Sequence, residues 1–172
     1  MTQRAACISI VLALVSSPIV AQDRAPCPVA RSGAVVIYGE VTNNVTVTAA
    51  ELASAPRTAI KGTAHDGTTT EYTGVPLHHL LARAGLPAGA QMRGAELQRY
   101  VVIEAADAYR AVFALAELDP AFRNPVAILA DRKDGKPLDA ETGSFQLVSP
   151  GEQRHARWVR QVVCIRSMRD KP

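Results

Sequence analysis

The feature that most constrains the fold of this chain is a series of short β-branched segments separated by turn signals. Residues 34–41 and 45–48 are rich in Val, Ile and Thr, which favour strands. Similar segments follow at 57–64, 68–73, 100–105, 110–113, 126–130, 145–148 and 162–165. Because these segments do not alternate regularly with helices, the sequence predicts an α+β fold with a mixed, barrel-like sheet core and short helices.

Two short helices are predicted between the strands. Thr48-Ala-Ala-Glu51 has the pattern of a capping box and opens a helix that Pro56 ends. Residues 75–84 form the clearest helix, because their leucines share one face and Pro76 suits the first turn. Helical turns are also expected at 115–118 and 157–158.

The first residues have the pattern of a secretory signal peptide. One arginine precedes an uncharged apolar run at 5–20, and Ala21 offers a small residue for cleavage. The run is shorter than the roughly 20 residues of a spanning helix, although a retained anchor is the alternative. We expect a signal peptide at 1–21, a tail at 22–33 and a single domain at 34–168. The mature protein is then periplasmic or secreted, with no membrane attachment.

Export also predicts the state of the cysteines. Cys7 would leave with the signal peptide, so that Cys27 and Cys164 remain. An even pair in an oxidising compartment predicts a disulfide, here between the tail and the last strand. The alternative is a metal or redox pair, for which no neighbouring His or Cys gives support.

Charge and motifs exclude several classes of function. The formal net charge of +3 is too small for a nucleic-acid-binding domain. The adjacent His78 and His79 point about 100° apart on a helix, so they chelate one metal poorly. The sequence contains none of the usual zinc, phosphate-loop, dinucleotide or serine-nucleophile motifs.

The most informative polar segment is 150–158, Pro-Gly-Glu-Gln-Arg-His-Ala-Arg-Trp. It places Arg154, His155 and Arg157 within four positions after a predicted strand. Arginine binds phosphate bidentately, and backbone amides at such a turn add to an anion site. The segment is therefore a candidate anion site, with a solvated basic turn as the alternative.

Five motifs in order resemble the molybdopterin-binding domain of the sulfite oxidase family, over roughly residues 34–166. They are Tyr72-Thr-Gly-Val-Pro-Leu77 with Leu80-Leu81, Asp107-Ala-Tyr109 with 113–118, Ile128-Leu-Ala130 with Asp134-Gly-Lys-Pro-Leu138 and Gly143, Phe145–Gly151, and Arg154-His-Ala-Arg-Trp158. The resemblance implies an α+β fold that holds the pterin-dithiolene cofactor molybdopterin. It gives Arg154, His155 and Arg157 the role of holding the pterin and its phosphate.

The chain departs from the resemblance at the metal. The family's molybdenum ligand is a Cys in the strand before the Tyr72 motif, and residues 57–66 contain no Cys. Lys61, Thr63 and His65 do not reproduce a soft, anionic thiolate. The family's strand before Val-Pro also carries an Arg, whereas this chain has Phe145 and Gln146 there, so one cationic contact is missing.

These features predict an exported domain that binds a small anionic ligand or the pterin cofactor. The missing Cys argues against bound molybdenum and against the family's catalysis. The alternative is an active, small molybdenum-dependent oxidoreductase with a non-Cys ligand set. A third interpretation is a subunit that docks on an exported redox partner.

Overall fold

The structure is a computed structural model that describes residues 27–28, 33–63 and 67–170. The predicted signal peptide at 1–21 and His65 lie outside these residues, as does most of the predicted tail at 22–33. No helix in the described part of the chain is long and apolar enough to cross a membrane.

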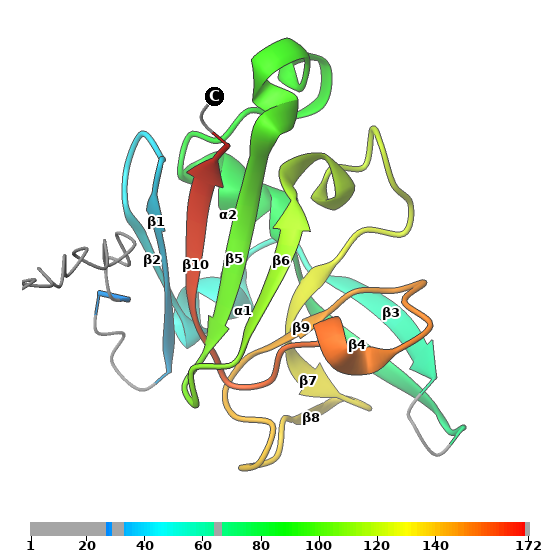
Figure 1. Ribbon diagram of the computed structural model, residues 1–172. Helices are drawn as coiled ribbons and strands as arrows, with labels where there is room; N and C mark the ends of the chain where they lie inside the picture. The colour runs from blue at the N-terminus through cyan, green and yellow to red at the C-terminus, as the bar shows by residue number, and fades with distance from the viewer. Residues whose placement is uncertain (1–26, 29–32, 64–66, 171–172) are drawn as a thin grey trace, which may run out of the picture.

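The first sheet has five strands in the spatial order β2-β1-β10-β5-β6. The last strand of the chain, β10, lies between β1 and β5, parallel to β1 and antiparallel to β5. Figure 1 shows β10 in red beside blue β1, so that the two ends of the domain meet in one sheet. The strands are β1 (Ala34–Gly39), β2 (Val45–Thr48), β5 (Arg99–Ala105), β6 (Arg110–Ala114) and β10 (Val162–Arg169).

The second sheet is built on β4 and β7, which pair with each other in antiparallel fashion. β3 pairs with the free edge of β4, and both β8 and β9 pair with β7. The strands are β3 (Thr58–Thr63), β4 (Thr69–Pro76), β7 (Ile128–Lys133), β8 (Lys136–Pro137) and β9 (Gln146–Val148).

The helices are short, as predicted. In α1 (Ala49–Ser54) the Thr48 hydroxyl accepts the Glu51 N–H, and the Glu51 carboxylate accepts the Thr48 N–H, which confirms the capping box. The second helix, α2 (Leu77–Arg83), begins two residues later than predicted, because β4 continues through Pro76. Short 3₁₀ helices are η1 (Gly89–Gln91), η2 (Gly94–Gln98), η3 (Leu115–Leu118) and η4 (His155–Arg157).

The main core joins the two sheets and both helices. Alternate residues of the first sheet, such as Ile37 and Ile165, meet Leu129 of β7 and Leu147 of β9. Leu80 of α2 belongs to the same buried cluster, and all five side chains are at most 1% exposed. Burying each such side chain stabilises the fold by about 1.5–3 kcal/mol.

The α+β prediction is confirmed, and the barrel-like closure is corrected. Among the described residues, no backbone pairing joins an edge of the first sheet to an edge of the second, so the two sheets are open. At the edges, β6 runs directly into η3 and β8 has only two residues.

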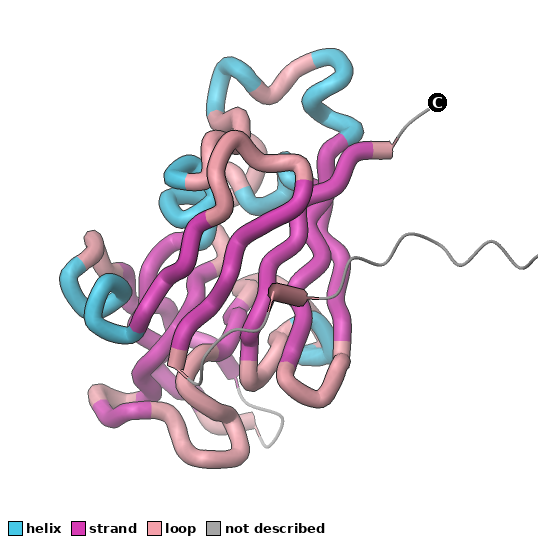
Figure 2. The backbone as a smooth tube through the Cα atoms, turned by 90° about the vertical axis from the view of Figure 1, so that its left-hand side faces the viewer, coloured by secondary structure: helices cyan, strands magenta, loops and turns pink. Residues whose placement is uncertain are grey.

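The structure contains the predicted disulfide between Cys27 and Cys164. Cys164 lies on the outer face of β10 in a small cluster with Val36 and Tyr38, against which Cys27 and Val163 pack. Figure 2 shows the short described piece that carries Cys27 lying across the strands of the first sheet. The bond therefore fixes the N-terminal piece to the central strands.

Candidate functional site

The candidate site begins where β9 leaves the second sheet and the chain turns into η4. Trp158 ends this turn, and its indole N–H donates to the Ser149 carbonyl at 2.8 Å. The indole packs on the outer face of the second sheet, edge-on to Tyr72 with 5.5 Å between ring centroids. Burial raises the pKa of the Tyr72 hydroxyl, in keeping with this apolar contact.

Trp158 also covers the strand where the resemblance places a metal-binding Cys. A Cβ added to Gly62 of β3 would lie 2.4 Å from the edge of the indole ring. Lys61 and Thr63, on either side of Gly62, are exposed. The space over Gly62 on this outer face of the sheet is therefore filled by the chain's own tryptophan.

We expect Gly62→Ala to lower the free energy of unfolding by about 1–2 kcal/mol, because the added methyl must displace the indole. The matched control is Lys61→Ala on the same strand, whose exposed side chain should change stability by less than about 0.5 kcal/mol. Denaturant unfolding measures both variants. Equal stability of the two would contradict the contact between Gly62 and Trp158.

A surface hollow of about 470 Å³ opens beside Trp158. The His155 imidazole stacks on the indole with 4.1 Å between ring centroids, and both rings line the hollow. Tyr109, which is 47% exposed, forms a further aromatic part of the wall. This volume is within the range of small-ligand pockets, about 300–1,000 Å³.

The wall opposite η4 is held in place by backbone contacts. The Asp107 carboxylate accepts the Tyr109 N–H, and the Tyr109 hydroxyl donates to the Ala156 carbonyl at 2.5 Å. Ala108 and Gln161 have φ values of +67° and +50°, a region that costs L-residues free energy. Strained residues of this kind cluster at functional sites, and these two flank or line the hollow.

The hollow carries charges of both signs. Arg160 and Glu141 line it and form an exposed ion pair with each other, whereas Asp107 has no cationic partner in the described part of the chain. A ligand in the hollow would therefore meet aromatic rings together with carboxylates that accept hydrogen bonds.

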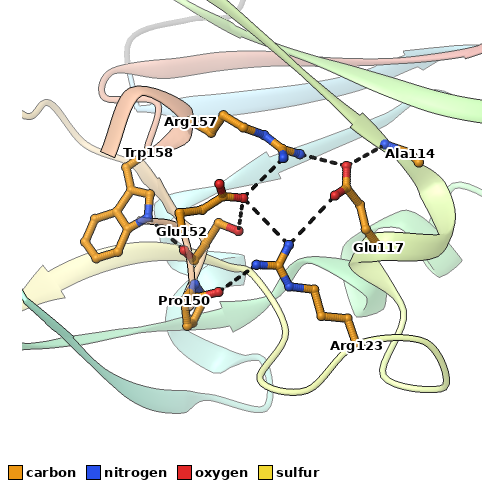
Figure 3. Close-up of polar contacts among 8 residues, drawn as sticks. Ala114, Glu117, Arg123, Pro150, Glu152, Arg157 and Trp158 are labelled. Carbon is orange, nitrogen blue, oxygen red and sulfur yellow. Dashed lines mark hydrogen bonds and ion pairs between the residues drawn. The ribbon is translucent and has the colours of Figure 1, made fainter. Parts of the chain in front are cut away.

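Arg157 does not line the hollow and belongs instead to a network of alternating charges, which Figure 3 shows. Its guanidinium lies 2.7 Å from a Glu117 oxygen and 3.2 Å from a Glu152 oxygen, and it covers the Phe113 ring at 3.9 Å. Arg123 lies 3.8 Å from Glu117 and 3.6 Å from Glu152. Each arginine thus contacts both carboxylates.

The three residues predicted to bind an anion are separated in space. Arg154 is exposed just before η4, and no described residue forms an ion pair with it. His155 lines the hollow, and Arg157 belongs to the charge network. The described residues do not bring these three side chains into one basic pocket.

The described residues do not offer a site for a thiolate-held metal. Cys27 and Cys164 are bonded to each other, and no group of three His, Cys, Asp or Glu side chains in this part of the chain is arranged to hold a metal. His78 and His79 have ring centroids 4.2 Å apart, and burial lowers the pKa of His78.

Sequence reasoning did not single out several residues of the site. Glu117 lies within the recognised stretch 113–118 and Glu152 within the segment 150–158, but neither was given a role, and Arg123 lies in no motif. The pairing of Arg157 with Glu117 joins residues forty positions apart. Tyr109 was noticed only as part of the Asp107-Ala-Tyr109 motif. The one local signal that could have placed Tyr109 at a binding surface is that it is an aromatic residue directly after a turn.

Comparison with known proteins identifies a family and similar solved structures. A family model described as "Oxidoreductase molybdopterin binding domain" matches residues 25–172. The crystal structure of the sulfane dehydrogenase SoxCD from Paracoccus pantotrophus is similar, with a TM-score of 0.60 and 23% sequence identity. The alignment covers 78% of this chain and 37% of that chain, so the likeness concerns the fold. No curated protein matches the sequence significantly.

Proposed function

The chain belongs to the oxidoreductase molybdopterin-binding domain family, and from this membership we propose that it binds a small pterin-type ligand without a thiolate-held metal. The membership also confirms the resemblance drawn from the five sequence motifs. The ligand would occupy the hollow beside η4. The proposal keeps the family's ligand class and leaves out its metal.

The observation that carries the proposal is the hollow itself. His155, backed by Trp158, and Tyr109 give it aromatic walls on which a planar heterocycle can stack. The Asp107 and Glu141 carboxylates line the same space and can accept hydrogen bonds from ring amino and N–H groups. A pterin has both a planar ring and such donors.

The metal part of the cofactor does not fit these residues. Molybdenum in the resemblance is held by a thiolate, and both cysteines in the described part of the chain are consumed by a disulfide. Trp158 packs against Gly62 of β3, within the segment 57–66 where the resemblance places the family's Cys. We therefore assign no reaction step to a metal.

The location and partners of the protein are also part of the proposal. The apolar N-terminal run and the disulfide both support an exported, periplasmic or secreted protein. Exposed Tyr109 and Phe122 offer contact area for an exported redox partner, the further role suggested by the family.

The test uses Trp158, which is the only tryptophan of the chain. Pterin-6-carboxylic acid should quench its emission saturably, because a ligand in the hollow lies against the His155–Trp158 stack. His155→Ala should weaken binding about three- to tenfold, the size of one aromatic contact.

The matched control is His79→Ala, since His79 is an exposed imidazole on α2 that does not line the hollow. This variant should bind the pterin as the wild type does. The proposal fails if the wild type shows no saturable quenching, or if both histidine variants bind with the same affinity.

A further inference from the structure

We propose that the free edge of β3 binds an extended segment of a partner protein, and that this segment carries an acidic residue followed four positions later by an apolar one. β3 ends the second sheet, and among the described residues only β4 pairs with it (Figure 1). A strand added to such an edge gains backbone hydrogen bonds along its length. No residue of β3 lines the hollow, so the inference does not rest on the pterin proposal.

Three residues of β3 present their backbone groups to the free edge. The Glu71 carbonyl of β4 accepts the N–H of Asp134, which directly follows β7, at 2.8 Å, so the backbone groups of Glu71 face β7. Lys61 lies opposite Glu71 in the β3–β4 pair, and backbone groups alternate in direction along a strand. The N–H and C=O groups of Ala59, Lys61 and Thr63 therefore point away from β4.

The side chains of these three residues also leave the edge open. They are exposed, and they share one face of the sheet, because Ile60 and Gly62 between them face the Trp158 side. β3 contains no proline, and its register with β4 does not shift. Proline and bulges are two common devices that protect an edge from pairing, and this strand of six residues has neither.

An apolar groove of about 510 Å³ lies at the start of β3. Its apolar side chains come from the residues before β3, from β4 and from α2: Ala55, Pro56, Val75, Leu80 and Ala82. Val75 lies four residues after Glu71 on β4, so the groove is on the same face as the exposed side chains of β3. A partner residue opposite Arg57 would point its side chain toward this groove, which favours an apolar residue there.

The acidic residue is inferred from the charges along the same path. Lys61 is exposed, and no described residue forms an ion pair with it. Glu71 faces Lys61 only from the β4 side. His79 and Arg83 border the groove, so it too has cationic groups at its rim. Opposite charges directly across an antiparallel pair stabilise it, so we place an acidic residue opposite Lys61.

The same lysine argues against a second copy of this chain as the occupant. Antiparallel pairing of β3 with itself uses all three outward residues only when Lys61 lies opposite Lys61. Like charges directly opposite each other destabilise a strand pair. A different chain with the complementary charge is therefore the better fit.

The experiment measures binding of a labelled peptide to the full, disulfide-bonded protein by fluorescence anisotropy. The peptide has eight residues, all threonine except for glutamate at the third position and leucine at the seventh. It should bind saturably, and replacing its glutamate by lysine should weaken binding about three- to tenfold. Lys61→Glu should reverse this preference, because it exchanges the charge at the edge.

The matched control in the protein is Lys136→Glu, an exposed lysine of β8 at the other end of the second sheet, which should keep the wild-type preference. The control in the peptide is methylation of a backbone nitrogen. Methylation at the glutamate, whose N–H faces β3, should weaken binding about tenfold, whereas methylation at the next residue, whose N–H faces away, should not.

The inference is overturned if the wild type shows no saturable binding, if Lys61→Glu and Lys136→Glu have the same preference, or if both methylated peptides bind equally. Sedimentation of the protein without peptide tests the other occupant. A dimer that dissociates in Ala59→Pro, which removes an outward N–H, would assign the edge to a second copy and would equally overturn it.

Discussion

Removing the Cys27–Cys164 disulfide should lower the free energy of unfolding by about 4 kcal/mol. The bond joins residues 137 positions apart, and closing so long a loop restricts the unfolded chain strongly. It also holds the N-terminal piece against β10, where Cys164 is fully buried. Denaturant unfolding of oxidised and reduced protein measures the difference.

The control for this prediction is Cys27→Ser measured with and without reductant. This variant has no bond to reduce, so the two unfolding curves should coincide, and both should match the reduced wild type within about 1 kcal/mol. If the oxidised wild type were no more stable than Cys27→Ser, the disulfide would have no part in holding the fold.

Truncation of Arg157 should destabilise the protein by about 2–3 kcal/mol, which is less than the loss of a fully buried ion pair. Arg157→Ala leaves Glu117 with only the distant Arg123 as a cationic neighbour, and it uncovers the Phe113 ring. The Arg157 side chain is 32% exposed to solvent. Solvent screening therefore makes the loss of stability smaller than that for a fully buried ion pair.

The matched control is Arg160→Ala, three residues along the chain. Arg160 also pairs with a glutamate, but the two side chains are 56% and 81% exposed. Its truncation should cost less than about 1 kcal/mol. Equal losses for the two arginines, measured by denaturant unfolding, would show that the charge network of Figure 3 does not stabilise the fold.

Most of the strands could be predicted because their signals are local. The strand at 45–48 and the capping box at Thr48 have the predicted bounds. The segment 86–98 had no apolar periodicity, and its turns η1 and η2 were missed. η1 is fixed by a distant contact, since the buried Asp119 carboxylate accepts the Gly89 N–H at 2.7 Å.

The Tyr72 motif shows how a sequence pattern can be recognised before its reason is visible. A Cβ on Gly74 would lie 2.1 Å from the Leu129 carbonyl oxygen, so only glycine lets β4 approach β7 this closely. The pairing shifts register at the same point, between Thr73 and Gly74. No local feature of the sequence predicts that β4 and β7 lie so close together at Gly74.

The candidate site was predicted only in part. The sequence places Arg154, His155 and Arg157 in one basic cluster, which favours an anion site. The fold assigns them different roles, because Glu117, forty residues before Arg157, draws that side chain inward. The spacing of residues within a motif does not predict such long-range charge pairing. The motif does predict that His155 lies at a surface turn.

The most direct test of the account is elemental analysis of the mature protein for molybdenum and tungsten, with pterin fluorescence on the same sample, after export by a host that makes the cofactor. The account predicts no retained metal in folded, disulfide-bonded protein, because no thiolate is free to hold it. Near-stoichiometric molybdenum or tungsten would contradict it, and would mean that other side chains of this fold hold the metal.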